Sequence, residues 1–166
     1  IDKTFVQKKQ TTIDKQHFRP VIEGLHEVYK SGTASRLQIA DINICGKTGT
    51  VENFATVDGE KTKLQDHSVF LAFAPKENPK IVIAVFIENG GFGATWAGPI
   101  ASLMIEKYLK GEITRTDLEK RMLEGDLSSN YVLKDIAEKQ KEERDRLKRV
   151  EKERLEKLKA NRNGKN

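Results

Sequence analysis

The sequence predicts an α+β fold, in which an antiparallel sheet is flanked by helices and followed by a charged helical tail. Two apolar runs, Ser68–Ala74 and Ile81–Ile87, are separated by only a short connection. Such a connection suffices for an antiparallel hairpin and is too short for a parallel crossover. Apolar residues at helical spacing on either side of these runs predict the flanking helices.

The N-terminal part predicts one helix. Residues 1–13 mix a few apolar residues with Lys, Gln and Thr, which is typical of an edge strand or an extended loop. Pro20 is tolerated in the first turn of a helix and Gly32 supplies a C-terminal stop, so we expect a helix over 18–31. The residues on its apolar face are Phe18, Val21, Ile22, Leu25, Val28 and Tyr29.

Three strands and a second helix follow. The first strand is expected over Ile42–Phe54, and the charged, turn-forming stretch Val57–Gln65 predicts an exposed loop. Ile81–Ile87 is apolar almost throughout, so we expect a central strand covered on both faces by the helices at 18–31 and about 96–110. The buried stripe of the second helix should consist of Ile100, Leu103, Met104 and Tyr108, with Gly111 ending the helix.

The composition changes after residue 110. We expect 1–110 to be one folded part, 111–133 to be a linker with a short helix at about 113–124, and 134–166 to be a charged helical or disordered tail. The tail has favourable ion-pair spacing but too little apolar surface to pack onto the folded part. Its thin apolar seam favours a solvated helix, while a coiled-coil protein partner stays open. The seam residues are Leu147, Val150, Leu155 and Leu158.

The charge distribution argues against nucleic-acid binding. The net charge of +5 arises within residues 134–166, which hold 13 Lys or Arg and 8 Asp or Glu, whereas residues 1–133 hold 17 of each. A nucleic-acid-binding domain would show a basic face, and none is indicated. The single Cys45 excludes an internal disulfide and is expected to be a core thiol. The three histidines do not have the spacing of a metal site.

The segment Gly46–Thr50 reads Gly-Lys-Thr-Gly-Thr within the first predicted strand. It does not complete a phosphate-binding loop, because that motif requires glycine where Asp41 stands. The later Gly91-Phe92-Gly93 does not complete a dinucleotide fingerprint, because Trp96 occupies the position of the third glycine.

A Lys-Thr-Gly strand is one of three sequence blocks of the penicillin-binding serine acyltransferases and their β-lactamase relatives. Here it follows Ser31-Gly32-Thr33-Ala34 and precedes Asp66–Pro75, Asn78–Gly91 and a helix-like run ending at Gly111. This order resembles the C-terminal end of the transpeptidase domain of class B penicillin-binding proteins, in particular the penicillin-binding protein 2 group. The resemblance covers about residues 1–110 and implies part of the penicillin-binding and serine β-lactamase type of fold.

The resemblance also implies roles for four residues. The Lys47 ammonium would provide positive charge where a substrate or β-lactam carboxylate docks, and the Thr48 and Thr50 hydroxyls would complete that site. The Thr50 backbone N–H would be one of two oxyanion-hole donors. Gly49 would lack a side chain because the acyl group lies against the strand like an added β-strand.

The other two blocks of the family do not occur in their expected places. No serine has lysine three positions later, so the chain has no S-x-x-K. Ser128-Ser129-Asn130 fits S-x-N, but it follows the Lys-Thr-Gly strand instead of preceding it, and we interpret it as a coincidence. We therefore expect a piece of a longer protein that is inactive alone.

The predicted function is that of a peptidoglycan D,D-transpeptidase, which cross-links the cell wall by serine acyl transfer. The resemblance implies a peptidoglycan stem peptide and β-lactams as partners, no cofactor or metal, no nucleic acid, and a periplasm-facing domain held at the inner membrane by an anchor outside this chain. Two alternatives stay open: a serine β-lactamase-type hydrolase, and a non-catalytic interaction module whose charged tail binds a partner.

Overall fold

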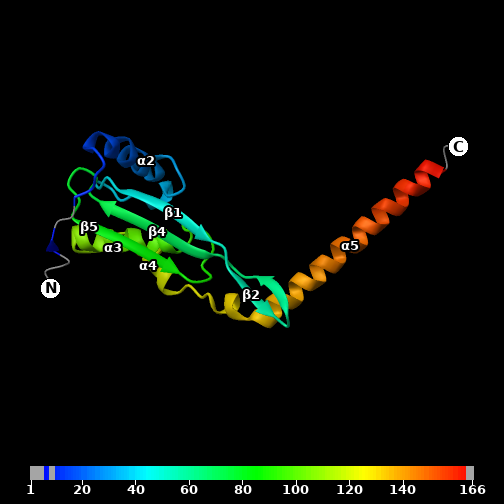
Figure 1. Cartoon of the computed structure of the whole chain (residues 1–166). Helices are drawn as coiled ribbons and strands as arrows, with labels where there is room; N and C mark the ends of the chain where they lie inside the picture. The colour runs from blue at the N-terminus through cyan, green and yellow to red at the C-terminus, as the bar shows by residue number, and fades with distance from the viewer. Residues whose placement is uncertain (1–5, 8–9, 164–166) are drawn as a thin grey trace.

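The computed structural model describes residues 6, 7 and 10–163. Its main sheet contains the strands β1 (Cys45–Val51), β4 (His67–Ala74) and β5 (Ile81–Ile87), in the order β1-β4-β5. Both pairs of neighbours are antiparallel, so the predicted hairpin between β4 and β5 is confirmed. Figure 1 shows the sheet and helices as one body from which the last helix projects.

One face of the sheet forms the core. Alternate residues of β4, Ser68 through Ala74, are buried on this face. Helix α2 (Phe18–Lys30) and helix α3 (Ala97–Lys110) supply the opposing residues, so both predicted helices are confirmed. The ring of Tyr29 meets that of Phe70 edge-on at 5.8 Å.

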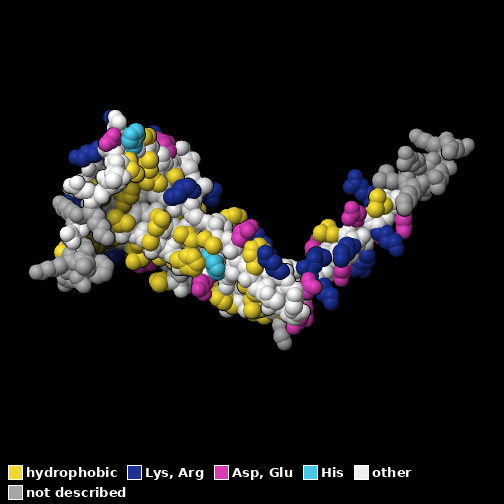
Figure 2. Space-filling model, viewed as in Figure 1, with side chains coloured by type: hydrophobic (Ala, Val, Ile, Leu, Met, Phe, Trp, Pro, Cys, Tyr) yellow, Lys and Arg dark blue, Asp and Glu magenta, His cyan; other side chains and the backbone are white. Residues whose placement is uncertain are grey.

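The other face of the sheet is open, which contradicts the expectation for Ile81–Ile87. Strand β5 is at the edge of the sheet and β4 is central. Val82 and Phe86 are 77% and 54% exposed, and Figure 2 shows apolar side chains gathered on this face. A continuous apolar run does not reveal how many faces are covered, because that depends on elements elsewhere in the chain.

Helix α3 turns a different stripe to the sheet than the sequence predicts. Leu103 is buried, but Met104 and Tyr108 are 52% and 63% exposed. The buried side is built around Ala97, Ala101 and Ile105. Two apolar stripes share the helical spacing, and the smaller side chains let the helix lie close to the sheet. Gly111, with φ of 81°, ends the helix as predicted.

The predicted loop over Val57–Gln65 is wrong, because a second hairpin occupies this region. It consists of β2 (Phe54–Val57) and β3 (Glu60–Lys63). Asp58 and Gly59 form the turn with φ of 51° and 82°, values that suit an Asp-Gly hairpin.

The strand predicted over Ile42–Phe54 is shorter in the structure, where β1 spans Cys45–Val51. Ile42 instead makes an isolated bridge to Ile39. Near the N-terminus, residues 10–14 form no strand, so the extended-loop alternative holds there, while the rest of that prediction lies largely outside the described residues. Short 3₁₀ turns occur at Lys15–His17, Ser35–Leu37 and Ser128–Tyr131.

Residues after α3 are tied to the folded part. The short helix expected at about 113–124 is present as α4 (Thr116–Leu123). Just before it, Arg115 donates from Nε to Glu106 Oε2 at 2.9 Å and from Nη1 to Ser102 Oγ at 2.8 Å. After it, Gly125 lies so close to Trp96 that a Cβ would overlap the indole ring.

Helix α5 (Leu133–Asn163) is the charged tail in helical form. The expectation that it does not pack holds for residues 141–157, which are all exposed, including Leu147, Val150 and Leu155. It is wrong for the first turns, because Ile136 and Ala137 are half-buried where α5 contacts the β2–β3 hairpin. There Gln140 donates from Nε2 to the Lys63 carbonyl at 2.5 Å. The side chain of Leu158 lies outside the described part.

Candidate active-site strand

The four predicted site residues, Lys47 through Thr50, lie on edge strand β1. One side of β1 pairs with β4, with Lys47 opposite Leu71 and Gly49 opposite Val69. Its other side pairs with no strand in the described part of the chain. A free strand edge offers backbone donors and acceptors to an extended ligand.

Lys47 presents an accessible positive charge. Its side chain is exposed, and Nζ donates to the Thr48 carbonyl at 2.9 Å. No Asp or Glu among the described residues forms an ion pair with it. Its charge is therefore available to an anionic ligand.

The alternation of β1 separates the predicted side chains. Lys47 and Gly49 belong to one face, and Thr48 and Thr50 belong to the other. Thr48 is half-buried, with its Oγ1 3.0 Å from Thr33 Oγ1, while Thr50 is exposed. The structure thus places Thr33 beside the predicted site residues. In the sequence, the only sign of this was that Thr33 belongs to the Ser31–Ala34 block of the family resemblance.

Two glycines allow close packing around β1. A Cβ on Gly49 would lie 3.2 Å from the Val69 Cβ, which is tighter than ordinary contact. Gly93, in the connection between β5 and α3, crosses so near that its Cβ would lie 2.8 Å from the Gly49 carbonyl oxygen. Packing therefore also restricts side chains here, in addition to the expected clearance for a ligand.

A buried asparagine lies beyond the end of β1. Asn89 is 5% exposed and has a positive φ of 54°. Its Oδ1 accepts from Asn53 Nδ2 at 2.6 Å, and its backbone N–H donates to His67 Nδ1 at 3.1 Å. The sequence offers no motif for this arrangement, because its members come from three separate parts of the chain.

Cys45 and two of the histidines have structural surroundings. Cys45 is buried, and burial raises the pKa of its thiol, as expected for a core thiol. His26 Nδ1 lies 3.1 Å from the Ile44 carbonyl oxygen, and His67 accepts from Asn89. Within the described residues, no group of three or more His, Cys, Asp or Glu could hold a metal.

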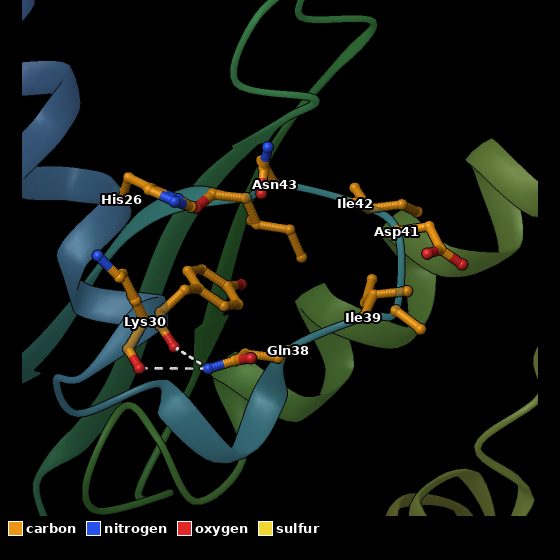
Figure 3. Close-up of a pocket in the computed structure, with 10 residues that line it drawn as sticks. His26, Lys30, Gln38, Ile39, Asp41, Ile42 and Asn43 are labelled. Atoms are coloured by element: carbon orange, nitrogen blue, oxygen red, sulfur yellow. Dashed lines mark hydrogen bonds between the residues drawn. The ribbon is translucent and has the colours of Figure 1, made fainter.

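A pocket of about 500 Å³ lies beside β1 but does not include Lys47, Thr48, Gly49 or Thr50. Figure 3 shows His26 and Lys30 on α2 facing the segment that carries Gln38 and Asn43. The Gln38 amide donates to the Tyr29 carbonyl at 2.8 Å and so satisfies the end of α2. This pocket is separate from the predicted site.

The exposed Lys47 charge would attract an anion, but the described residues contain no assembled acyl-transfer centre. Ser68 and Ser102 are buried and use their hydroxyls within the fold. Ser128 is bonded to Asp126.

No helix in the described part is both long and apolar enough to cross a bilayer.

Comparison with known proteins gives a consistent result. The family model described as "Penicillin binding protein transpeptidase domain" matches residues 2–106. The peptidoglycan D,D-transpeptidase MrdA of Haemophilus influenzae is 33% identical over 104 residues, which cover 57% of this chain and 16% of MrdA. The peptidoglycan D,D-transpeptidase PbpA of Mycobacterium tuberculosis is 38% identical over 79 residues, which cover 45% of this chain and 15% of PbpA.

Solved structures agree with the sequence matches. The imipenem acyl-enzyme complex of penicillin-binding protein A from M. tuberculosis superposes with a TM-score of 0.51 at 29% identity, covering 62% of this chain and 21% of that one. The ceftriaxone acyl-enzyme complex of the same protein gives a TM-score of 0.53 at 27% identity, covering 62% of this chain and 23% of that one. The chain thus spans less than a quarter of the relatives that it matches.

Proposed function

Because the chain belongs to the penicillin-binding protein transpeptidase domain family, we propose that it is part of a peptidoglycan D,D-transpeptidase and supplies the strand against which substrate docks. The observation that carries this proposal is the exposed Lys47 ammonium on a strand with a free edge. An extended stem peptide pairs with such an edge as an added strand, and its carboxylate is attracted by the ammonium.

In this proposal each residue of the motif has one task. Lys47 binds the carboxylate of the stem peptide or of a β-lactam by reaching over the unpaired edge of β1, because its side chain starts on the opposite face from Thr48 and Thr50. The hydroxyls of Thr48 and Thr50 donate to the same carboxylate. The Thr50 backbone N–H stabilises the oxyanion that forms during acylation. Gly49 keeps the strand surface clear. Thr33, 3.0 Å from the Thr48 hydroxyl, orients that hydroxyl.

The serine nucleophile and its base come from parts of the whole protein that carry the S-x-x-K and S-x-N blocks. The whole protein then acts at the periplasmic face of the bacterial inner membrane, where peptidoglycan lies. Two relatives are named as peptidoglycan D,D-transpeptidases, which favours this function over a β-lactamase-type hydrolase.

The exposed part of α5 favours a second, compatible role in binding a protein partner. Leu147, Val150 and Leu155 are each about half exposed or more on a helix that otherwise carries charges. In this role the tail acts apart from catalysis, as an extension of the folded unit.

Substitution of Lys47 in the full-length protein tests the proposed function. A charge-assisted bond of about 2–3 kcal/mol predicts that Lys47→Ala slows acylation by a β-lactam roughly 30- to 150-fold. Stopped-flow or gel-based acylation kinetics measure this rate. Lys80→Ala, at another exposed lysine, is the control and should acylate normally.

Thermal unfolding separates binding from structure in the same experiment. Lys47→Ala should leave the unfolding midpoint unchanged, since its exposed side chain makes no ion pair in the described part of the chain. An acylation rate equal to that of the parent would overturn the role of Lys47 as the carboxylate anchor.

A further inference from the structure

Three asparagines from distant parts of the chain are linked beyond the end of β1. Asn53 donates to Asn89 Oδ1 at 2.6 Å, and Asn130 donates from Nδ2 to the Asn89 carbonyl at 2.8 Å. Asn53 is two residues past β1, whereas Asn130 lies well beyond residue 106, where the family match ends. The C-terminal segment therefore reaches the end of the Lys-Thr-Gly strand through two hydrogen bonds.

Asn89 is suited to couple the position of Asn130 to that of Asn53, because it is held rigidly between them. It is nearly fully buried, and its left-handed backbone conformation is uncommon for residues other than glycine. Its backbone N–H is bonded to His67 on β4. Because its N–H, carbonyl and side-chain oxygen are all bonded, Asn89 cannot shift without breaking at least one of these bonds.

The segment that carries Asn130 is itself fixed. The Asp126 carboxylate accepts from the Ser128 backbone N–H and hydroxyl, both at 2.8 Å, and these bonds hold the pKa of Asp126 below its usual value. Tyr131 donates from its hydroxyl to the Glu88 carbonyl at 3.1 Å. We call residues 126–131 the clasp, because they hold the turn that follows β5.

We propose that Asn130 is a positioning residue for the Lys-Thr-Gly strand. The clasp fixes the Glu88–Asn89 turn, this turn fixes Asn53, and Asn53 fixes the end of β1 just beyond Thr50. Its effect on acylation rests on the proposed function, whereas its effect on the strand does not. The Ser128-Ser129-Asn130 sequence thereby gains a structural role that is distinct from that of a catalytic S-x-N block.

Hydrogen exchange on the 166-residue chain tests the strand directly. In Asn130→Ala, loss of one hydrogen bond should make two sets of amides exchange about tenfold faster: those of Thr50 and Val51 at the paired end of β1, and that of Leu64, which donates to the Asn53 carbonyl at 2.9 Å. The amides of α2 should stay unchanged. Ser129→Ala is the matched control, because Ser129 is exposed and its side chain makes no hydrogen bond among the described residues. Its exchange should equal that of the parent.

A second variant covers the case in which Asn130→Ala does not fold. Tyr131→Phe removes only the hydroxyl that bonds Glu88, and it should increase exchange at the same amides by a smaller factor. Unchanged exchange at Thr50, Val51 and Leu64 in the folded variants overturns the proposal. So does an equal increase in α2, which would indicate general loss of stability.

Acylation of the full-length protein separates this proposal from the proposed function. Asn130→Ala should slow β-lactam acylation about tenfold if Lys47→Ala also slows it. Normal acylation by Lys47→Ala would refute the anchoring role, and hydrogen exchange would still decide whether Asn130 positions the strand. A different outcome is that Asn130→Ala exchanges fast but is acylated at the normal rate, while Lys47→Ala is acylated slowly. That result would overturn the effect of Asn130 on the reaction.

Discussion

Glu106 and Arg115 form a buried ion pair that holds the segment after α3 against the core. Glu106 is 1% exposed and also accepts from the Thr114 hydroxyl at 2.6 Å. Burial alone would raise the pKa of Glu106, but the hydrogen bonds from Thr114 and Arg115 outweigh it and lower the pKa. The carboxylate is therefore charged in the folded protein at neutral pH.

Removal of the arginine should be costly. Arg115→Ala leaves the Glu106 charge buried without its partner, so we expect the free energy of unfolding to fall by about 3 kcal/mol. Urea denaturation of the 166-residue chain measures this change. Lys107→Ala, at an exposed position on the same helix as Glu106, is the control and should change the free energy by less than about 0.5 kcal/mol. A similarly small change for Arg115→Ala would contradict the prediction.

The lowered pKa of Glu106 also predicts a pH dependence. The folded protein binds the Glu106 proton less readily than the unfolded chain, whose value is 4.5. The stabilisation is thus complete above that value and is lost as pH falls through the lower folded pKa. Urea denaturation at a series of acidic pH values should show a shallower decline in Glu106→Gln than in the parent, and equal declines would refute this assignment.

Sequence patterns do not reveal such an ion pair. Thr114 and Arg115 are ordinary polar residues in a stretch that follows a helix stop, and their partner lies one helix earlier. Lys47 could be identified because the motif is local and contiguous. The links through Asn89 and Thr33 depend on segments that meet only after folding.

At the scale of elements, the start of α5 differs from its remainder. Ile136 and Ala137 are half-buried and Gln140 bonds the hairpin, whereas residues 141–157 are exposed throughout. Figure 1 shows this later part leaving the body as a single helix. We propose that the folded unit extends to Gln140 and that the tail begins after it.

Two truncations should separate these parts. Removal of residues 141–166 should leave the thermal midpoint unchanged, because the described side chains that are removed, those of residues 141–157, are all exposed. Removal of everything after Leu133 also takes away the docked turns, and a loss of about 1 kcal/mol should lower the midpoint by about 2–4 °C. Calorimetry measures both midpoints, and identical values would show that the first turns of α5 do not stabilise the domain.

The elements differ in how well their own residues determine them. Helices α2 and α3 and the β4–β5 hairpin follow from periodicity and connection length, which are local properties. Asp58-Gly59 carried a hairpin signal, but the charges around it favoured a loop. The edge position of β5 depends on strand order, which its own apolar sequence does not contain.

For the whole molecule, the missing S-x-x-K block predicts a negative result. The 166-residue chain should form no covalent adduct with a fluorescent penicillin, because it lacks the serine-lysine pair that acylation requires. Denaturing gel electrophoresis with fluorescence detection tests this, with an intact penicillin-binding protein as the positive control. A labelled band from this chain would show that acylation uses another nucleophile.

The open face of the sheet affects how the chain behaves in concentrated solution. Val82 and Phe86 present apolar surface on a strand whose outer edge has no strand partner in the described part of the chain. Unprotected edges of this kind favour association between molecules. At high protein concentration the chain should therefore form dimers and larger aggregates. Association of folded molecules, and not unfolding, then sets the highest concentration at which this polypeptide can be used.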